Sequence, residues 1–255
     1  KIEKPSAIDN LDSILEVADG VMVARGDMGV ELPEEKVPIL QKEIIRQANQ
    51  RGRVVITATQ MLESMVEHPR PTRAEASDVA NAILDGTDAI MLSAETASGR
   101  YPVEALATMA RIAEYTETHI GQSPVRRDAD SPSPDGSAVT RAVASASCRA
   151  AEELSARYVM AFTESGATVR TVSQSRPRPP ILGFTPSERV YRRLALRWGV
   201  TPVRAGRYDT TDKMLDAAIQ FLTSRGLVDP GDVVVVVCGT TTLSGATNMM
   251  KILKF

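Results

Sequence analysis

The chain has 255 residues, of which 43% are hydrophobic and 24% charged, as in a globular protein with one large domain or two ordinary ones. The formal net charge of −2 lacks the basic excess typical of nucleic-acid binders, and no apolar run is long enough to cross a bilayer. We therefore expect no nucleic-acid partner and no membrane partner. No signal peptide opens the chain, which favours a cytoplasmic location, and Cys148 and Cys238 are expected to be buried free thiols.

Two charged residues, Lys1 and Glu3, open the chain with one apolar residue between them. Residues i and i+2 of a strand point to the same face, so these two side chains are expected to project together. From the spacing alone, a surface ion pair is the more common outcome. We expect the rest of their strand, and part of the function, to lie in residues upstream of Lys1.

The first part of the chain alternates short apolar runs with amphipathic stretches, which predicts parallel strands joined by right-handed helical crossovers. The strands lack polar alternation, so we expect both faces of their sheet to be covered. Pro33 and Pro102 suit the first turns of helices, and Gly52 and Gly86 suit helix ends. The expected strands are residues 20–24, 53–58 and 89–93, and the expected helices are residues 8–18, 37–50, 74–84 and 103–115.

A segment with almost no apolar residues, 121–136, contains Ser, Pro, Asp, Arg and Gly and is predicted to be a linker. It divides the chain into a first domain, residues 1–120, and a second α/β domain, residues 137–255. The second domain is expected to contain helices at residues 137–154, 168–175, 187–198 and 212–225, strands at residues 158–163, 181–185, 202–204 and 233–238, and an edge strand at residues 251–255.

Polar residues follow each predicted strand of the first domain, at the carboxyl ends where parallel α/β folds collect their reactive groups. Together with Lys1 and Glu3, they place one lysine, two metal-capable carboxylates and two hydroxyls at one rim. Such a set suits Mg²⁺, which takes one or two carboxylates plus substrate oxygens, and a neighbouring lysine can neutralise a phosphoryl group. The residues that follow the strands are Arg25 to Asp27, Thr59 and Gln60, and Ser93 to Thr96.

Histidine chemistry is disfavoured, because the two histidines, His68 and His119, do not follow predicted strands. This argues against a Ser-His-Asp triad and against a histidine-based zinc site. Simpler roles also remain open for the polar residues, since Asp27 suits a turn and Thr59 suits a strand with a satisfied hydroxyl.

Five stretches of the sequence resemble the pyruvate kinase family, in order along the chain. They are residues 1–3 (KIE), 23–27 (VARGD), 56–65 (ITATQMLESM), 69–75 (PRPTRAE) and 91–96 (MLSAET). The resemblance covers the whole chain and is weaker after the linker. It implies an α/β protein: the second half of a (β/α)8 TIM barrel, followed by a smaller α/β C-terminal regulatory domain.

The resemblance also implies roles for the residues of the rim. Lys1 matches the lysine that stabilises the transferring phosphoryl group, and Glu3 and Asp27 match the carboxylates that hold Mg²⁺ or Mn²⁺. The backbone amides of Gly26 and Asp27 match those that bind the substrate carboxylate. Thr59 matches the threonine associated with enolate protonation through water.

Two further matches lie outside this set. Ser93 is a candidate for the same proton path, and Arg73 resembles an arginine that crosses the subunit interface of a homotetramer. The implied partners are phosphoenolpyruvate and ADP as substrates and pyruvate and ATP as products of this glycolytic reaction. K⁺ is implied as well, with ligands outside this chain.

Because the family's first four barrel strands lie upstream, we expect these 255 residues alone to be inactive. One alternative is a non-catalytic regulatory or assembly fragment of the same enzyme. Another is a different barrel enzyme with a metal-enolate site, such as a carbon-carbon lyase.

In the second domain, the stretch 163–168 lies between a strand and a helix and is either a helix N-cap or a phosphate-binding loop. It resembles the family's sugar-phosphate effector loop, and residues 238–245 match the second wall of that pocket. Glu164 is acidic and Ala167 has no donor, which favours a monophosphate effector or weak regulation over a bisphosphate. The candidate effector residues are Thr163, Ser165, Gly166 and Thr168.

Overall fold

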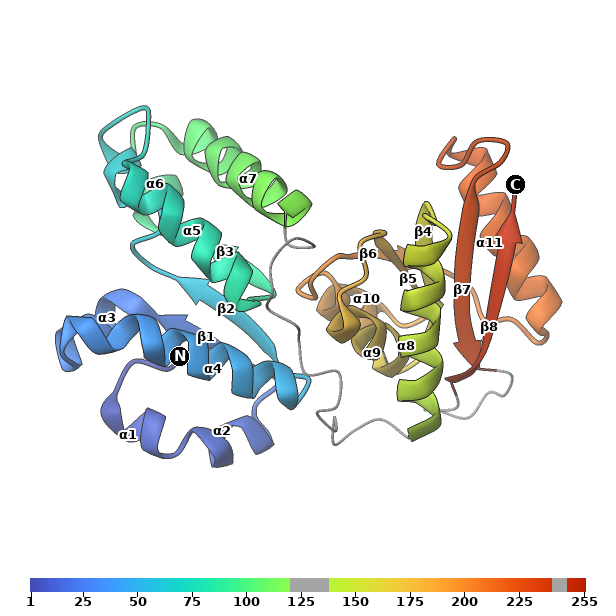
Figure 1. Ribbon diagram of the computed structural model, residues 1–255, viewed down its shortest axis with the longest axis horizontal. Helices are drawn as coiled ribbons and strands as arrows, with labels where there is room; N and C mark the ends of the chain where they lie inside the picture. The colour runs from blue at the N-terminus through green and yellow to red at the C-terminus, as the bar shows by residue number, and fades with distance from the viewer. Residues whose placement is uncertain (120–137, 240–246) are drawn as a thin grey trace. The chain divides into compact units, whose positions relative to one another are not determined.

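The computed structural model describes residues 1–119, 138–239 and 247–255 (Figure 1). The chain separates into two compact units, Lys1–Ser133 and Pro134–Phe255, and each is described here by itself. The predicted linker, residues 121–136, and most of the predicted second wall of the effector pocket lie outside the described residues. No helix in the described ranges is long and apolar enough to span a membrane.

The first unit is built around a parallel sheet with the order β1-β2-β3. Ile2 pairs with Val23 in a parallel bridge, which extends this order by the opening residues of the chain. In sequence order, the elements are α1 (Pro5–Asp9), α2 (Leu11–Val17), β1 (Gly20–Ala24), α3 (Arg25–Glu31), η1 (Glu34–Lys36), α4 (Val37–Gln50), β2 (Val54–Ala58), η2 (Glu63–Val66), α5 (Arg73–Asp85), β3 (Ala89–Met91), α6 (Ala94–Ala97) and α7 (Pro102–His119).

Most predicted helices of this unit are confirmed, and two details are wrong. The helix expected over residues 8–18 is two helices, which meet at Asn10. There the side-chain amide competes with the backbone amide for the Ser6 carbonyl, at 2.8 Å and 3.3 Å. Pro33 caps the short 3-10 helix η1, and it is Pro38 that lies in the first turn of α4. Pro102 begins α7, as expected.

The two faces of the first sheet are not equally covered, contrary to the expectation. Val21, Val23 and Val55 are buried in a core with α2 and α4. Met22 and Ile56, which alternate with them and therefore point to the opposite face, are only partly buried. This second face is the one that would turn inward if the sheet continued into a closed barrel.

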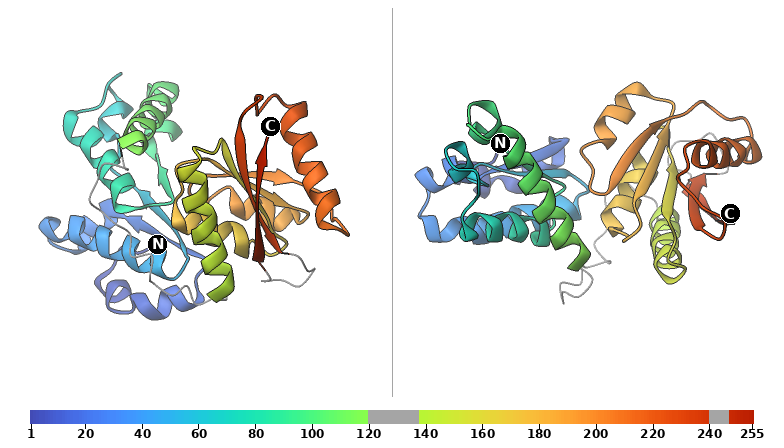
Figure 2. Two further views of the ribbon diagram at one scale, coloured as in Figure 1. Left: turned by 45° about the vertical axis from the view of Figure 1, so that its right-hand side comes forward. Right: turned by 90° about the horizontal axis from the view of Figure 1, so that it is seen from above.

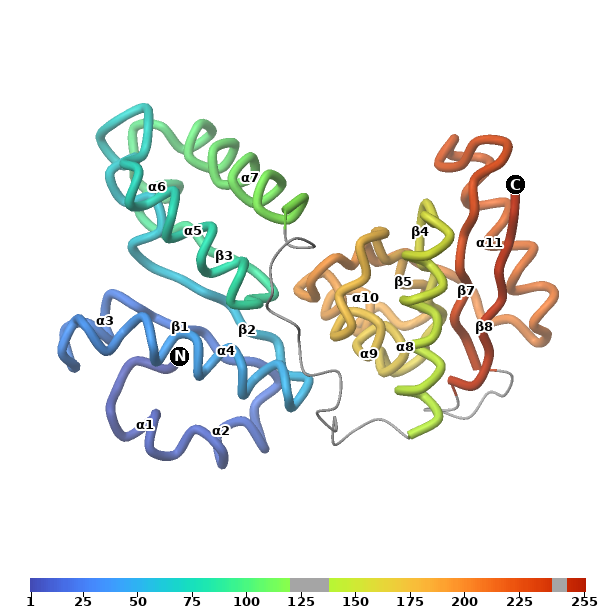
Figure 3. Tube along the Cα trace, viewed as in Figure 1, coloured from blue at the N-terminus to red at the C-terminus, as the bar shows by residue number. Residues whose placement is uncertain are grey.

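The second unit is a five-stranded sheet with the order β6-β5-β4-β7-β8, parallel except for the antiparallel pair β7 and β8. β8 is the predicted edge strand, although it is longer than expected. Figure 3 traces the path of the chain through the elements, which are α8 (Ala138–Glu153), β4 (Tyr158–Phe162), α9 (Ala167–Ser175), β5 (Ile181–Thr185), α10 (Glu188–Leu194), β6 (Val200–Arg204), α11 (Thr211–Ser224), β7 (Val233–Gly239) and β8 (Thr247–Lys254).

Helices cover both faces of this second sheet, as Figure 2 shows. Val235 and Val237 of β7 belong to a core with α8, α9 and α10. Val234 and Val236 belong to a core on the other face with α11. Since successive residues of a strand point to opposite faces, the unbroken valine run of β7 fills both cores.

Candidate active site

The strand register brings the carboxyl ends of the first sheet together. Ala24, Ala58 and Met91 lie at equivalent positions of β1, β2 and β3. Beside β1, the Ile2 amide donates to the Met22 carbonyl (2.8 Å), and the Ala24 amide donates to the Ile2 carbonyl (3.3 Å). The opening residues therefore lie at the same rim as the residues that follow the three strands.

Lys1 lies between two carboxylates at this rim. Its Nζ is 2.9 Å from Asp27 Oδ2 and 3.0 Å from Glu3 Oε2. The hydrogen bond to Asp27, followed by the ion pair with Glu3, raises the pKa of Lys1, and the hydrogen bond from Lys1 lowers the pKa of Asp27. The structure thus brings together three residues that the sequence analysis selected, from two segments.

The donor set at this rim fits a hard divalent cation. Glu3 Oε2 is buried and accepts no hydrogen bond within the described part of the chain, although Lys1 is its ion-pair partner. In the same described part, no group of three or more His, Cys, Asp or Glu side chains could hold a metal ion by itself. Two carboxylates that leave further positions to substrate oxygens are the kind of set that Mg²⁺ uses.

Thr59 connects the ends of β1 and β2. Its Oγ1 accepts a hydrogen bond from the Gly26 amide (2.8 Å) and donates to the Ala58 carbonyl (2.6 Å). Thr59 and Gln60 both have positive φ angles, 69° and 52°, which residues other than glycine rarely adopt. We call these two residues the Thr59–Gln60 turn.

Two buried charged residues lie near the turn, and the sequence pattern predicts no role for either of them. Arg25 is 6% exposed and contacts the backbone of the turn, and Glu95 is 3% exposed and contacts the segment that follows it. Both lie in the stretches that resemble pyruvate kinase, and both follow a strand. The feature that distinguishes these two residues is the burial of their charges, which cannot be read from a single sequence.

Ser93 and Arg73 lie in different settings. Ser93 precedes α6, and its amide donates to Glu95 Oε2 (2.7 Å), which places it at the rim. Arg73 is exposed at the first position of α5. Its role across a subunit interface stays a prediction.

The candidate effector loop lies between β4 and α9. Thr163 Oγ1 accepts from the Gly166 amide (2.9 Å), so a hydroxyl satisfies an amide there, while Gly166 itself caps α9 in a left-handed conformation. Thr168 is buried, and its Oγ1 lies 2.6 Å from Thr247 Oγ1 of β8. Ser165 is exposed.

The charge of Glu164 in this loop is partly compensated, because Arg207 Nε lies 3.4 Å from its carboxylate. Because of this ion pair, Glu164 presents less negative charge to a bound phosphate than the sequence alone indicates, and it disfavours a bisphosphate less strongly.

Comparison with known proteins covers both units. A family model described as "Pyruvate kinase, barrel domain" matches residues 1–106, and one described as "Pyruvate kinase, alpha/beta domain" matches residues 141–253. The chain is 48% identical over 253 residues to a pyruvate kinase of Clostridium acetobutylicum, an alignment that covers 99% of this chain and 53% of the relative.

Two further pyruvate kinases show similar agreement. The one from Clostridium perfringens is 46% identical over 255 residues, covering 100% of this chain and 54% of the relative. The one from Bacillus licheniformis is 48% identical over 252 residues, covering 99% of this chain and 43% of the relative. The chain spans about half the length of the curated relatives that it matches.

Proposed function

This chain belongs to the pyruvate kinase family, and we propose that it carries part of an active site that transfers a phosphoryl group from phosphoenolpyruvate to ADP, giving pyruvate and ATP in glycolysis. The observation that carries the proposal is the meeting of Lys1 with Glu3 and Asp27 at the rim that also holds Thr59. A cytoplasmic location follows from the proposed pathway.

Lys1 contributes positive charge where the phosphoryl group moves. Its pKa is raised by Asp27 and Glu3, so the ammonium group stays protonated at neutral pH. A protonated lysine at the transferring group stabilises the negative charge on its oxygens.

Glu3 and Asp27 are the residues that would hold Mg²⁺ or Mn²⁺, which when bound supplies positive charge to the phosphate and enolate oxygens of the substrate. We also propose a K⁺ requirement, with ligands outside this chain. The first turn of α3, at Gly26 and Asp27, is proposed to bind the substrate carboxylate, because amides at a helix start attract anions. The Gly26 amide donates to Thr59 Oγ1 in this structure, so it must share or exchange that bond when the substrate binds.

Thr59 is proposed to donate a proton, through water, to the enolate that phosphoryl transfer leaves behind. Its hydroxyl donates to the Ala58 carbonyl in this structure, so that donation must be exchanged for one to water. Ser93, at the neighbouring strand end, is a second candidate for this path.

The test is phosphoenolpyruvate-dependent ATP formation by the protein at its natural length. Lys1→Met is expected to lower kcat by about 100-fold or more, as for the loss of a donor that stabilises transition-state charge. Lys4→Gln, an exposed lysine at the start of α1, is the matched control and should keep full activity.

Absence of ATP formation in a folded protein of natural length would overturn this proposal. It would favour the non-catalytic regulatory or assembly role instead. Cleavage of a carbon-carbon bond in place of phosphoryl transfer would favour the metal-enolate lyase.

We further propose that the protein is a homotetramer with Arg73 at a subunit interface.

We also propose that the loop of Thr163, Ser165, Gly166 and Thr168 binds a sugar monophosphate effector. The exposed Ser165 hydroxyl, just before the start of α9, supports an anion there, because the first amides of a helix attract negative charge. Activation should respond to a sugar monophosphate and be lost in Ser165→Ala, with Ser187→Ala at the start of α10 as control. Strong activation by fructose bisphosphate that depends on Ser165 and Thr168 would contradict the choice of ligand.

A further inference from the structure

We propose that Arg25 and Glu95 are positioning residues that hold the Thr59–Gln60 turn in its left-handed conformation and so place the Thr59 hydroxyl at the rim. The structural part of this proposal stands on contacts within the first unit. Its kinetic consequence rests on the proposed function.

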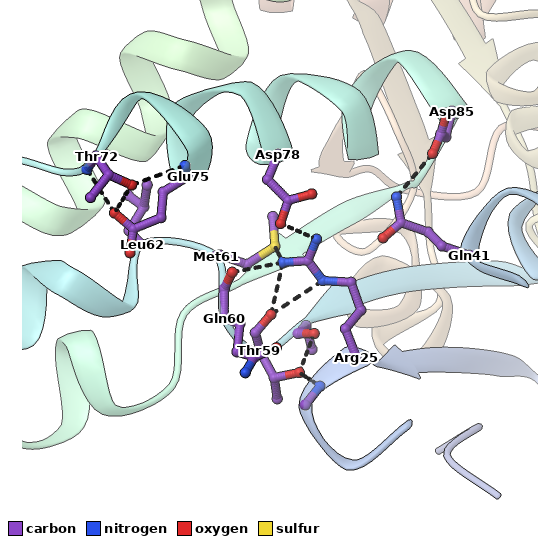
Figure 4. A network of polar contacts seen from close by, with 12 residues as sticks. Arg25, Gln41, Thr59, Gln60, Met61, Leu62, Thr72, Glu75, Asp78 and Asp85 are labelled. Atoms are coloured by element: carbon purple, nitrogen blue, oxygen red, sulfur yellow. Dashed lines mark hydrogen bonds and ion pairs between the residues drawn. The ribbon is translucent and has the colours of Figure 1, made fainter. Parts of the chain in front are cut away.

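The Arg25 side chain donates hydrogen bonds to the backbone carbonyls of the Thr59–Gln60 turn (Figure 4). Nη2 donates to the carbonyls of Thr59 (2.8 Å) and Gln60 (2.9 Å), and Nε donates to the Thr59 carbonyl (3.3 Å). The remaining Nη1 forms an ion pair with Asp78 of α5. The side chain is 7% exposed, so these contacts replace water around the guanidinium group.

Glu95 holds the other end of the same segment. Its Oε1 accepts from the Leu62 amide (3.1 Å), and its Oε2 accepts from the Ser93 amide (2.7 Å). The segment 59–62 is therefore held at its carbonyls by a buried cation and at an amide by a buried anion. Each charge comes from an element that follows a different strand, α3 for Arg25 and α6 for Glu95.

The contacts of Arg25 and Glu95 explain how the turn keeps its unfavourable backbone conformation. Two successive residues other than glycine have positive φ, and Thr59 is β-branched, which makes the conformation sterically costly. Such a conformation remains only where the surroundings determine it, and it is common at functional sites. The forked guanidinium of Arg25 supplies two carbonyl contacts that a lysine does not reproduce.

The contacts of Arg25 with the turn are directly linked to the position of the Thr59 hydroxyl. Arg25 holds the Thr59 carbonyl, while the next residue, Gly26, donates its amide to Thr59 Oγ1. The start of α3 therefore fixes both the backbone and the side chain of Thr59. A Cβ at position 26 would lie 3.4 Å from Thr59 Oγ1, in ordinary van der Waals contact with that side chain.

The structural test is amide hydrogen exchange in the protein at its natural length. Arg25→Lys keeps a positive charge for Asp78 and loses the fork, and we expect exchange at Gly26 and Leu62 to become about tenfold faster through local opening. Glu95→Gln should accelerate exchange at Leu62 and Ser93.

Arg53 provides the matched control. Its Nε and Nη2 donate to the carbonyls of Leu15 and Glu16, both at 2.8 Å, at the opposite end of β2. Arg53→Lys should leave exchange at Gly26 and Leu62 unchanged. Unchanged exchange at these amides in Arg25→Lys would overturn the proposal.

The kinetic test separates positioning from general destabilisation. Arg25→Lys is expected to lower kcat by about 100-fold, the cost of roughly 1 Å of misplacement, with a KM for phosphoenolpyruvate within about threefold of the original. Combined with Thr59→Val, its effect should be strongly non-additive, because both changes act through one hydroxyl. Arg53→Lys should combine additively with Thr59→Val.

The outcomes distinguish the two proposals. A protein without ATP formation from phosphoenolpyruvate refutes the proposed function, and hydrogen exchange then decides the positioning role by itself. Activity in the original protein, with additive effects of Arg25→Lys and Thr59→Val, overturns the link between Arg25 and the Thr59 hydroxyl.

Discussion

Lys1 has Asp27 Oδ2 at 2.9 Å and Glu3 Oε2 at 3.0 Å, and this geometry sets the charge state of the rim. The pKa of Lys1 is raised and that of Asp27 lowered, so both ionised forms are favoured over a wide pH range. Both side chains are largely exposed, so salt screens their attraction. The pair is therefore more important for local charge than for folding.

We predict that Asp27→Asn lowers the pKa of Lys1 more than Glu3→Gln does, because Asp27 is the larger cause of the shift. A titration of the lysine Nζ resonance by NMR measures this, with the exposed Lys4 as internal reference. Equal pKa values of Lys1 in the original protein and in Asp27→Asn would show that the ion pair does not form in solution.

The same shifts define two pH windows for stability. The pKa of Lys1 is raised, so its contribution is fully present below the ordinary value of 10.5 and is lost as the pH rises through the folded value. The pKa of Asp27 is lowered, so its contribution is present above 3.8 and is lost as the pH falls through the folded value.

Cys148 and Cys238 are buried free thiols, as predicted. Burial raises the pKa of Cys148 to about 12 and that of Cys238 to about 11. The thiolate is the reactive form, so we predict that neither residue reacts with a thiol reagent at neutral pH in the folded protein. Both should react in denaturant, which is the control, and rapid labelling of folded protein would contradict their burial.

At the scale of elements, Ile2 attaches the opening residues to β1. It is 1% exposed, pairs with Val23 and packs with Leu15 and Ile44 of α2 and α4. Ile2 thus packs in the core, while its two neighbours, Lys1 and Glu3, lie at the rim.

Ile2→Ala is expected to lower the free energy of unfolding by about 2–5 kcal/mol, because it removes buried methyl groups and leaves a cavity. Ile39→Ala in α4 is the control, since Ile39 is 67% exposed and its loss should cost no more than about 0.5 kcal/mol. Urea unfolding measures both, and equal effects of the two changes would mean that the strand pairing of Ile2 is not stable.

The start of α5 depends on a capping box. Thr72 Oγ1 accepts from the Glu75 amide, and Glu75 in turn accepts from the Thr72 amide (2.7 Å) and from Ser64 of η2. Burial would raise the pKa of Glu75, but the hydrogen bonds from Ser64 and Thr72 hold it below its ordinary value. The box therefore joins α5 to η2.

We predict that Glu75→Gln destabilises the first unit by about 1 kcal/mol, because Gln keeps one acceptor oxygen but loses the second acceptor and the negative charge that strengthen the bonds to Ser64 and Thr72. The loss should shrink at acid pH, because the lowered pKa of Glu75 means that its contribution is present above 4.5 and disappears as the pH falls. Glu104→Gln, in the first turn of α7 and exposed, is the control in urea unfolding at both pH values. A destabilisation of the same size at acid and neutral pH would contradict the role of the carboxylate.

At the scale of the molecule, the first unit holds a partial sheet. Met22 and Ile56 are half-buried on its second face, and the chain spans about half the length of its relatives. The second unit covers both faces of its own sheet and has two cores. The two units therefore differ in how completely they bury their sheets.

We predict that a polypeptide of residues 1–255 alone forms no measurable pyruvate from phosphoenolpyruvate and ADP. The rim that it carries is only part of a barrel rim, and a sheet with open edges does not hold the groups precisely enough for transfer. The protein at its natural length is the positive control in the same assay. Pyruvate formation by the 255-residue polypeptide would contradict the prediction.

The type and order of most elements followed from the sequence, because helix and strand periodicity are local properties of the chain. Val37–Gln50 and Ile181–Thr185 were predicted to the residue, and the carboxyl ends of parallel strands placed Lys1, Asp27 and Thr59 at one rim. Only the tertiary structure showed the break at Asn10, the half-buried second face and the Arg25 and Glu95 contacts. Arg25 and the Thr59 carbonyl are 34 positions apart, and only packing decides which distant groups lose water and meet.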